Sequence, residues 1–181
     1  LVWSFAIGER ESLWVSGNNW VRRYINEWPY EQQEQYSLPG AVATILPLDD
    51  GTILTGGVMG LFEKSPGQSD FTRALHKPPH NGVQFWAYSL LKLQDRIFVS
   101  STQGLHEYIE EQKQLLPFGA YEGKQSVEGS VFATDGIETL WYVDAHNGLV
   151  RQYNVKSKKD TLAVDLNTFL GKSPYVTSMR H

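Results

Sequence analysis

Residues 42–61 read VATILPLDDGTILTGGVMGL, and this stretch contains the pattern that decides the fold. An apolar run leads into an Asp-Asp-Gly turn at residues 49–51, which is followed by a second run, a Gly-Gly loop and a Gly-Leu step. Asp-Gly pairs permit the positive φ angles of tight hairpins, and short apolar runs between turn signals are typical of strands. The stretch therefore predicts two antiparallel strands and the start of a third.

The same pattern recurs along the whole chain. Its Gly-Leu step, or the equivalent position, begins at residues that lie 40, 44 and 44 positions apart: Trp20, Gly60, Gly104 and Gly148. A second marker, the Leu-Trp step, agrees with this spacing and occurs at 13–14, 53–54, 97–98 and 140–141. Periods of roughly 40–50 residues made of short strands are typical of β-propellers, in which each repeat forms one four-stranded blade.

The sequence therefore predicts an all-β protein, a β-propeller of about four blades with four antiparallel strands each. The expected blades cover residues 1–40, 41–84, 85–128 and 129–174 as a single propeller segment, and 175–181 would start a fifth. Both ends of the sequence fall inside the strand pattern, and a seven-bladed ring at this spacing would need on the order of 300 residues. We therefore expect a segment of a longer, seven-bladed ring.

The strands can be assigned repeat by repeat. The expected first strands are Val2–Ile7, Val42–Leu48, Trp86–Leu93 and Val131–Thr134, and the second are Leu13–Ser16, Thr52–Thr55, Arg96–Ser100 and Thr139–Val143. The third strands start at the Gly-Leu step, where glycine is expected to permit close backbone approach. The least regular, outer strands are expected at Gln35–Leu38, Phe71–Leu75, Gln114–Phe118 and Thr161–Leu166. Trp14 and Trp141 share one repeat position, which favours packing in the core over ligand binding.

Composition excludes several classes of function. A net charge of −4, without a basic stripe, gives no reason to expect a nucleic-acid partner. Without cysteine, the chain has neither disulfides nor thiolate metal ligands. His76 and His80 are four residues apart, but Pro78 and Pro79 prevent the helix that would align them on one face. We expect no metal and no cofactor, and no Gly-x-Ser-x-Gly motif indicates a nucleophile.

The pattern resembles a known repeat. The stretch 42–61, Leu13-Trp14-Val15-Ser16-Gly17 with Arg23-Tyr24, and Leu140-Trp141 with Gly148-Leu149 and Tyr153 are similar to the two-component regulator propeller repeat, V-x-x-I…D-G-x-L-W-V-G-T-x-x-G-L-x-x-Y. The copies depart from it in places, because Trp20 replaces a glycine, Lys64 replaces the closing tyrosine, and Ser100-Ser101 replaces Gly-Thr. The resemblance implies that this chain belongs to the periplasmic sensor region of a hybrid two-component sensor histidine kinase. The full-length protein would then be anchored in the inner membrane.

Candidate ligand-binding residues lie in the loops that a propeller gathers on one face. The loops between second and third strands contribute Asn18, Asn19, Gln103, Asp144 and His146, and those between blades contribute Asn81, Trp86 and Tyr121. Trp20 is added because it breaks the repeat. The pairs Asn81-Gly82 and Asn147-Gly148 can also be explained without a ligand, because Asn-Gly pairs favour the positive φ angles of tight turns.

These observations favour a non-enzymatic segment that senses a small molecule or an oligosaccharide. One alternative is a protein-interaction scaffold, which would expose a large apolar patch. Another is a propeller lyase or hydrolase with catalytic groups in the central funnel of the whole ring. An incomplete ring leaves blade faces uncovered, so self-association into a homodimer is a further expectation.

Overall fold

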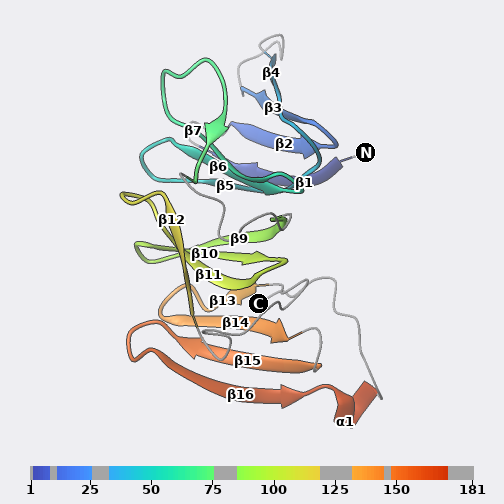
Figure 1. Cartoon of the computed structure of the whole chain (residues 1–181), viewed down its shortest axis with the longest axis vertical. Helices are drawn as coiled ribbons and strands as arrows, with labels where there is room; N and C mark the ends of the chain where they lie inside the picture. The colour runs from blue at the N-terminus through green and yellow to red at the C-terminus, as the bar shows by residue number, and fades with distance from the viewer. Residues whose placement is uncertain are drawn as a thin grey trace. The chain divides into compact units, whose positions relative to one another are not determined.

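The computed structural model describes residues 2–8, 12–25, 33–75, 85–118, 132–144 and 148–170. Four antiparallel sheets of four strands each, with the strands in chain order, make up the fold (Figure 1). The one helix of the described residues, α1 (Asn167–Leu170), is a single short turn. None of the described helices could cross a membrane. The expected all-β fold of four-stranded blades is confirmed.

The strand bounds follow the repeat. The first sheet contains β1 (Val2–Ile7), β2 (Leu13–Gly17), β3 (Trp20–Tyr24) and β4 (Gln33–Ser37). The second contains β5 (Val42–Pro47), β6 (Ile53–Gly57), β7 (Gly60–Lys64) and β8 (Thr72–Arg73). The third contains β9 (Ala87–Leu93), β10 (Arg96–Ser101), β11 (Gly104–Ile109) and β12 (Gln114–Pro117). The fourth contains β13 (Phe132–Thr134), β14 (Thr139–Asp144), β15 (Leu149–Asn154) and β16 (Lys159–Asp165).

Hairpin register confirms the alignment of the repeats at the Leu-Trp step. The second-strand residues Leu13, Ile53, Ile97 and Leu140 lie opposite the third-strand residues Tyr24, Lys64, Tyr108 and Tyr153, respectively. The fourth sheet differs at the other end of its hairpin, because Leu149 lies opposite Asp144 at the position that Gly60 and Gly104 occupy in their sheets. Its third strand therefore starts one residue later than the Gly-Leu spacing predicts.

The glycines that open the third strands have a different role from the predicted one. Gly60 and Gly104 have φ angles of 107° and 105°, which residues other than glycine rarely adopt. A Cβ atom on Gly104 would meet nothing within 4 Å, so close backbone approach is not the reason for glycine there. Close approach occurs instead at Gly57, where a Cβ atom would lie 2.0 Å from the carbonyl oxygen of Ala41.

Two predicted strands begin or end at other residues than expected. Trp86 lies just before β9 rather than inside it, and its side chain is exposed. The outer strand expected at Phe71–Leu75 is only the two-residue β8. Outer strands lack a neighbour on one side, so their sequences carry a weak pattern.

The chain divides into two compact units, Leu1–Ala87 and Tyr88–His181, each with two sheets. In the first unit, the core lies between the first sheet and the second sheet. Side chains of the first sheet and the residue that follows it pack against those of the second: Trp14, Val21, Tyr36 and Leu38 against Val42, Ile45, Ile53 and Phe62. In the second unit, the third sheet packs on the fourth through residues that include Phe98, Leu105, Phe118, Phe132, Leu140 and Tyr142. Trp14 is 4% exposed, which confirms its role in the core, whereas Trp141 at the same repeat position is only half-buried and lies outside the buried core of the second unit. The expected start of a fifth blade at 175–181 lies outside the described residues.

Candidate functional site

The turn between β2 and β3 holds two of the predicted site residues. The side chains of Asn18 and Asn19 are exposed there, and the carbonyl oxygen of Asn19 accepts a hydrogen bond from the Leu38 N–H at 2.9 Å. That bond joins the turn to the segment that leads out of β4. The turn is thus held by its backbone, while the Asn19 amide side chain points to the surface.

Trp20 begins β3 directly after this turn, and its side chain is half-buried. The indole lies against Gly17, where an added Cβ would stand 2.3 Å from Trp20 Cε2. The Arg22 guanidinium lies 4.8 Å from the centre of the indole ring, in a cation–π arrangement. Trp20 therefore packs on its own hairpin and leaves part of its ring at the surface beside Asn18 and Asn19.

The equivalent turn of the third sheet contains Gln103. Its N–H donates to Ser101 Oγ at 3.1 Å, and Ser101 Oγ donates to the carbonyl oxygen of Gly104 at 3.1 Å. The side-chain amide of Gln103 is different, because its Nε2 and Oε1 atoms are both buried and neither has a hydrogen-bond partner among the described residues. Unpaired buried amide groups are costly, and each such group in a protein calls for an explanation.

Two further polar residues near this turn were missed by the sequence analysis. His106 is buried, with Nδ1 at 3.2 Å from the carbonyl oxygen of Gly104, and Ser100 is fully buried with no partner for its Oγ in the described part of the chain. Register places His106 where the second sheet has the buried Phe62 and the other two sheets have Arg22 and Arg151. This position varies between repeats, so no repeat signal identifies His106 as buried.

The remaining predicted residues are only partly described. Asp144 ends β14 opposite Leu149, and Trp86 is exposed ahead of β9. Asn81, Tyr121 and His146 lie outside the described residues. The structure thus brings Asn18, Asn19 and Trp20 together in one turn of the first unit, and it places Gln103 in a turn of the second.

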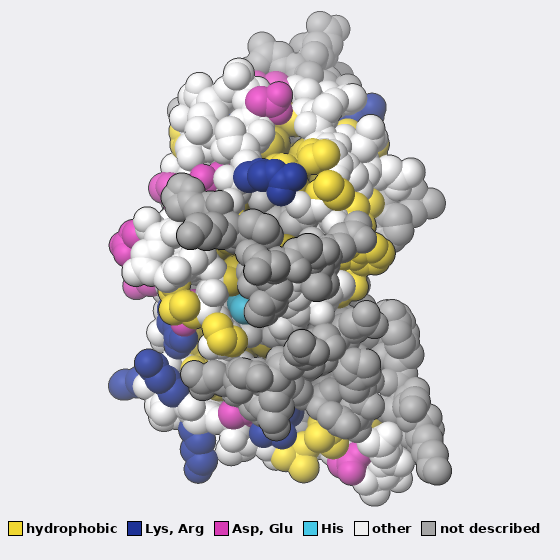
Figure 2. Space-filling view, in the orientation of Figure 1, with side chains coloured by type: hydrophobic (Ala, Val, Ile, Leu, Met, Phe, Trp, Pro, Cys, Tyr) yellow, Lys and Arg dark blue, Asp and Glu magenta, His cyan; other side chains and the backbone are white. Residues whose placement is uncertain are grey.

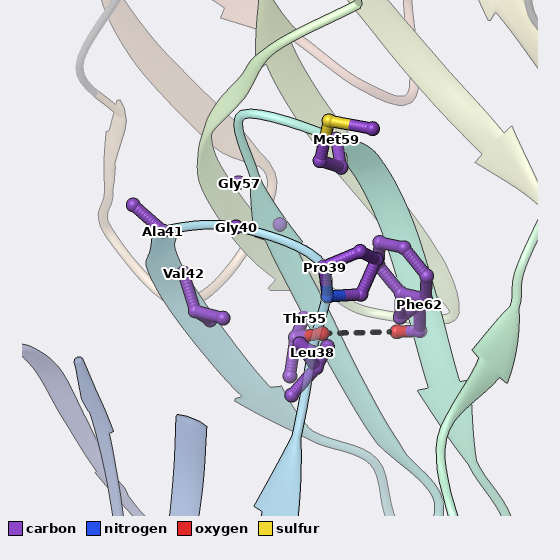
Figure 3. A pocket seen from close by; sticks show the side chains of 10 residues that line it. Leu38, Pro39, Gly40, Ala41, Val42, Thr55, Gly57, Met59 and Phe62 are labelled. Carbon is purple, nitrogen blue, oxygen red and sulfur yellow. Dashed lines mark hydrogen bonds between the residues drawn. The ribbon is translucent and has the colours of Figure 1, made fainter. Parts of the chain in front are cut away.

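Beside the β2–β3 turn, the segment between β4 and β5 crosses the β6–β7 hairpin (Figure 3). The cavity between them measures about 10 Å³, which is about the space of a single water molecule. It is closed by tight backbone contacts, such as the hydrogen bond from Val58 N–H to the Ala41 carbonyl at 3.0 Å. Thr55 Oγ1 donates to the carbonyl oxygen of Phe62 at 3.3 Å, so this hydroxyl is also occupied. A ligand at this end would therefore bind over the turns, not in this cavity.

Metal chemistry has no candidate centre in the ranges that the structure describes, because no three His, Asp or Glu side chains come together there. His76 and His80 lie outside those ranges. The geometry at hand is that of exposed amides, a half-exposed indole and an unpaired amide on sheet turns.

The fold defines the class of protein as a β-propeller built of four-stranded blades. No family model matches the sequence, and no curated protein matches it.

Solved structures do match. The extracellular domain of BT4673 from B. thetaiotaomicron, described as a one-component system, superimposes with a TM-score of 0.71 and 17% identity, covering 94% of this chain and 24% of that chain. The extracellular domain of the hybrid two-component system BT3049 from the same organism gives 0.70 and 14%, covering 94% and 23%. Virginiamycin B lyase from Staphylococcus aureus gives 0.66 and 10%, covering 89% and 54%.

These likenesses establish the fold. The chain spans about a quarter of the length of the two extracellular domains and about half that of the lyase. The same blade architecture thus occurs in extracellular domains of signalling systems and in an enzyme, so function has to be argued from the residues of this chain.

Proposed function

We propose that this chain is an extracytoplasmic ligand-sensing propeller segment of a two-component sensor histidine kinase or a related signalling receptor. The observation that carries the proposal is the likeness of 94% of the chain to extracellular domains of signalling systems, with TM-scores of 0.71 and 0.70. The membrane anchor, the periplasmic location and the kinase output belong to the proposal for the longer protein. The segment itself would bind and not catalyse.

The turn residues suggest which ligands fit. Asn19 offers an exposed amide beside the half-exposed indole of Trp20. Amides satisfy hydroxyl groups in both directions, and aromatic rings pack on the apolar faces of sugars. A small polyhydroxylated molecule or an oligosaccharide matches this chemistry. On the face shown in Figure 2, Lys and Arg side chains occur in several separate places rather than in one stripe, which does not favour a polyanion.

Calorimetric titration of the chain with a panel of neutral oligosaccharides tests this proposal. We expect a saturable heat with at least one of them, and a loss of roughly tenfold in affinity for Asn19→Ala, which removes hydrogen bonds to the ligand. Gln68→Ala is the matched control, because Gln68 is an exposed amide of the same unit, in the segment that follows β7. If every oligosaccharide fails to bind, or if the control loses as much affinity as Asn19→Ala, ligand sensing at the β2–β3 turn is wrong.

A second candidate function, a protein-docking scaffold, is favoured by the outer face of β1. Phe5 and Ile7 are 72% and 75% exposed there. By register, Phe5 is equivalent to Ile45 and Phe132, which are 6% and 7% exposed because a neighbouring sheet covers them. The side of β1 that carries Phe5 and Ile7 is thus as apolar as the buried sides of β5 and β13, but its side chains are exposed. An exposed apolar surface of this kind is typical of a protein-binding site. A propeller lyase is the third candidate, which turnover assays on the longer protein would decide.

A further inference from the structure

A cavity of about 190 Å³ opens in the first unit at the end of β2 that is opposite to Asn18 and Asn19. It lies between the first two sheets and is independent of the turns assigned to the proposed function. Its walls come from the start of β2, from β3, from the β5–β6 turn and from the segment that follows β7. The lining residues that matter here are Ser12, Trp14, Arg23, Ile53, Lys64 and Pro66.

The charged side chains that line this cavity are both positive. Two of its lining residues, Arg23 and Lys64, are cations, and among the described residues that line it there is no Asp or Glu. The Nε atom of Arg23 is buried and has no hydrogen-bond partner in the described part of the chain. A buried guanidinium donor without an acceptor is unfavourable, because it has lost its water and gained nothing in return.

One carboxylate, Glu34, lies nearby but does not supply that acceptor. Its Oε2 atom forms an ion pair with an Nη atom of Arg23 at 3.6 Å, which is beyond hydrogen-bond distance. The same oxygen accepts a 2.6 Å hydrogen bond from the Tyr36 hydroxyl. Oε2 of Glu34 thus takes both the Tyr36 hydrogen bond and the ion pair with Arg23, and the Nε donor of Arg23 has no acceptor in the described part of the chain.

The second unit shows how the same position is completed. Strand register makes Ser12, Arg23 and Lys64 of the first unit equivalent to Arg96, Glu107 and Tyr153 of the second. There, Arg96 holds the Glu107 carboxylate with two hydrogen bonds, from Nε at 2.7 Å and from Nη2 at 2.6 Å. Its Nη1 donates to the carbonyl oxygen of Val155 at 2.9 Å. Arg96 thus pairs with the carboxylate of its own sheet and reaches the backbone that follows the fourth sheet's β15.

The first unit keeps half of this arrangement. An arginine still lies over the second-strand aromatic ring: Arg23 is 5.5 Å from the Trp14 ring centre, as Arg96 is 5.1 Å from that of Phe98. The carboxylate, however, is replaced by the cation itself, and the large Arg96 side chain is replaced by that of Ser12. The result is a cavity lined by a guanidinium and an ammonium group, in which the carboxylate paired with the arginine, Glu34, comes from β4 and does not line the cavity.

We propose that this cavity binds a small organic carboxylate, which takes the role that Glu107 has in the second unit. The carboxylate would lie between Arg23 and Lys64 and accept hydrogen bonds from the guanidinium and ammonium groups, while the body of the ligand contacts Trp14, Ile53 and Pro66. A planar carboxylate matches the fork of a guanidinium group, and the apolar walls favour a ligand with a ring or a short hydrocarbon body.

The test observes Arg23 directly, by ¹⁵N–¹H correlation spectra of the arginine Nε–H groups of the chain during titration. The probes are benzoate and glucuronate, with benzamide and glucose as neutral analogues of the same shape, and inorganic phosphate as a second anion. We expect a saturable shift of one Nε–H signal, absent in Arg23→Gln, with the two carboxylates and not with their neutral analogues. No shift with either carboxylate, or a shift with phosphate alone, would overturn the proposal.

Variants separate binding from folding. Lys64→Gln should weaken carboxylate binding roughly tenfold, the usual effect of losing a charged hydrogen bond. Arg22→Gln is the matched control, since Arg22 lies one residue away, bonds to Gln35 and does not line the cavity, and it should bind normally. Equal losses in both variants would refute the site.

A double variant, Ser12→Arg with Arg23→Glu, recreates the Arg96–Glu107 pair inside the first unit. It should no longer bind benzoate, and it should unfold at a somewhat lower temperature than the unmodified chain, because position 23 lies opposite Glu34 in the β3–β4 pair. A double variant that folds and still binds benzoate with unchanged affinity would contradict the proposal. Asn19→Ala should leave benzoate binding unchanged, so failure of this site and failure of the proposed oligosaccharide site can be told apart.

Discussion

Single side chains fix the ends of the strands in this protein, and Asp135 gives the clearest case. Its Oδ1 atom accepts hydrogen bonds from the N–H groups of Ile137, Glu138 and Thr139 at 2.9, 3.1 and 2.9 Å, which closes the turn between β13 and β14. These donors, that of Ile137 first, lower the pKa of Asp135 from 3.8 to about 2. Asp135-Gly136 has the same Asp-Gly chemistry as the turn predicted at residues 49–51, and Gly136, with a φ of 76°, completes the turn.

The lowered pKa of Asp135 predicts a specific pH dependence of stability. Because the folded state holds the proton less tightly than the unfolded state, the stabilisation is fully present above pH 3.8 and is lost as the pH falls towards about 2. Asp135→Asn removes the charge, so its deficit in unfolding free energy should shrink over that interval. Urea unfolding at neutral pH and within the interval measures it, with Asp95→Asn in the β9–β10 turn as control. A deficit that stays constant with pH would contradict the prediction.

At the scale of strands, charged side chains that lie between two sheets connect one strand to another. Arg96 at the start of β10 bridges Glu107 of β11 and the carbonyl of Val155 after β15, so one side chain ties three segments of the second unit. Hydrogen bonding to Glu107 is the main cause that raises the pKa of Arg96 above its usual range. The first unit lacks this tie at the equivalent position, where the cavity lined by Arg23 and Lys64 is found.

Removing the Glu107 charge should therefore weaken the second unit. Glu107→Gln leaves the partly buried Arg96 without its carboxylate, and we expect a loss of about 1–3 kcal/mol of unfolding free energy. Glu110→Gln is the control, because Glu110 is an exposed residue in the β11–β12 turn. Urea unfolding of both variants measures the difference. Equal stability of the two variants would show that the pair contributes little.

Across the whole molecule, each sheet has an apolar side that needs a neighbour. Phe132 of β13 is buried against the third sheet, whereas the equivalent Phe5 of β1 is exposed. Since burial of an aromatic side chain is what stabilises it, the same residue type at the same repeat position should contribute differently in the two sheets.

Alanine substitution at these two positions tests that difference. Phe132→Ala should lower the unfolding free energy by about 3–5 kcal/mol, because it leaves a cavity in a packed core. Phe5→Ala should change it by less than about 0.5 kcal/mol, because the ring is already in water. Urea unfolding gives both values, and light scattering shows whether Phe5→Ala also lowers any self-association. A large loss of stability from Phe5→Ala would mean that its face is covered in solution.

The order of the amino acids was enough to predict the all-β fold, the four-stranded repeat and the Asp-Gly turns. These features depend on contacts within a hairpin, so they appear as short patterns such as the one at residues 42–61. The core role of Trp14 was predicted for the same reason, since its position repeats. Lys64 and Ser100 were also visible as departures from the repeat, although their consequences were not.

Those consequences depend on which segments the fold brings together. Arg23 and Lys64 belong to different sheets, and no local pattern shows that they line one cavity while Glu107 completes the equivalent position elsewhere. The unpaired Gln103 amide and the buried His106 likewise follow from burial, which depends on side chains from distant strands. The reason is physical: hairpin pairing is local along the chain, whereas burial and unpaired charge are set by packing between sheets.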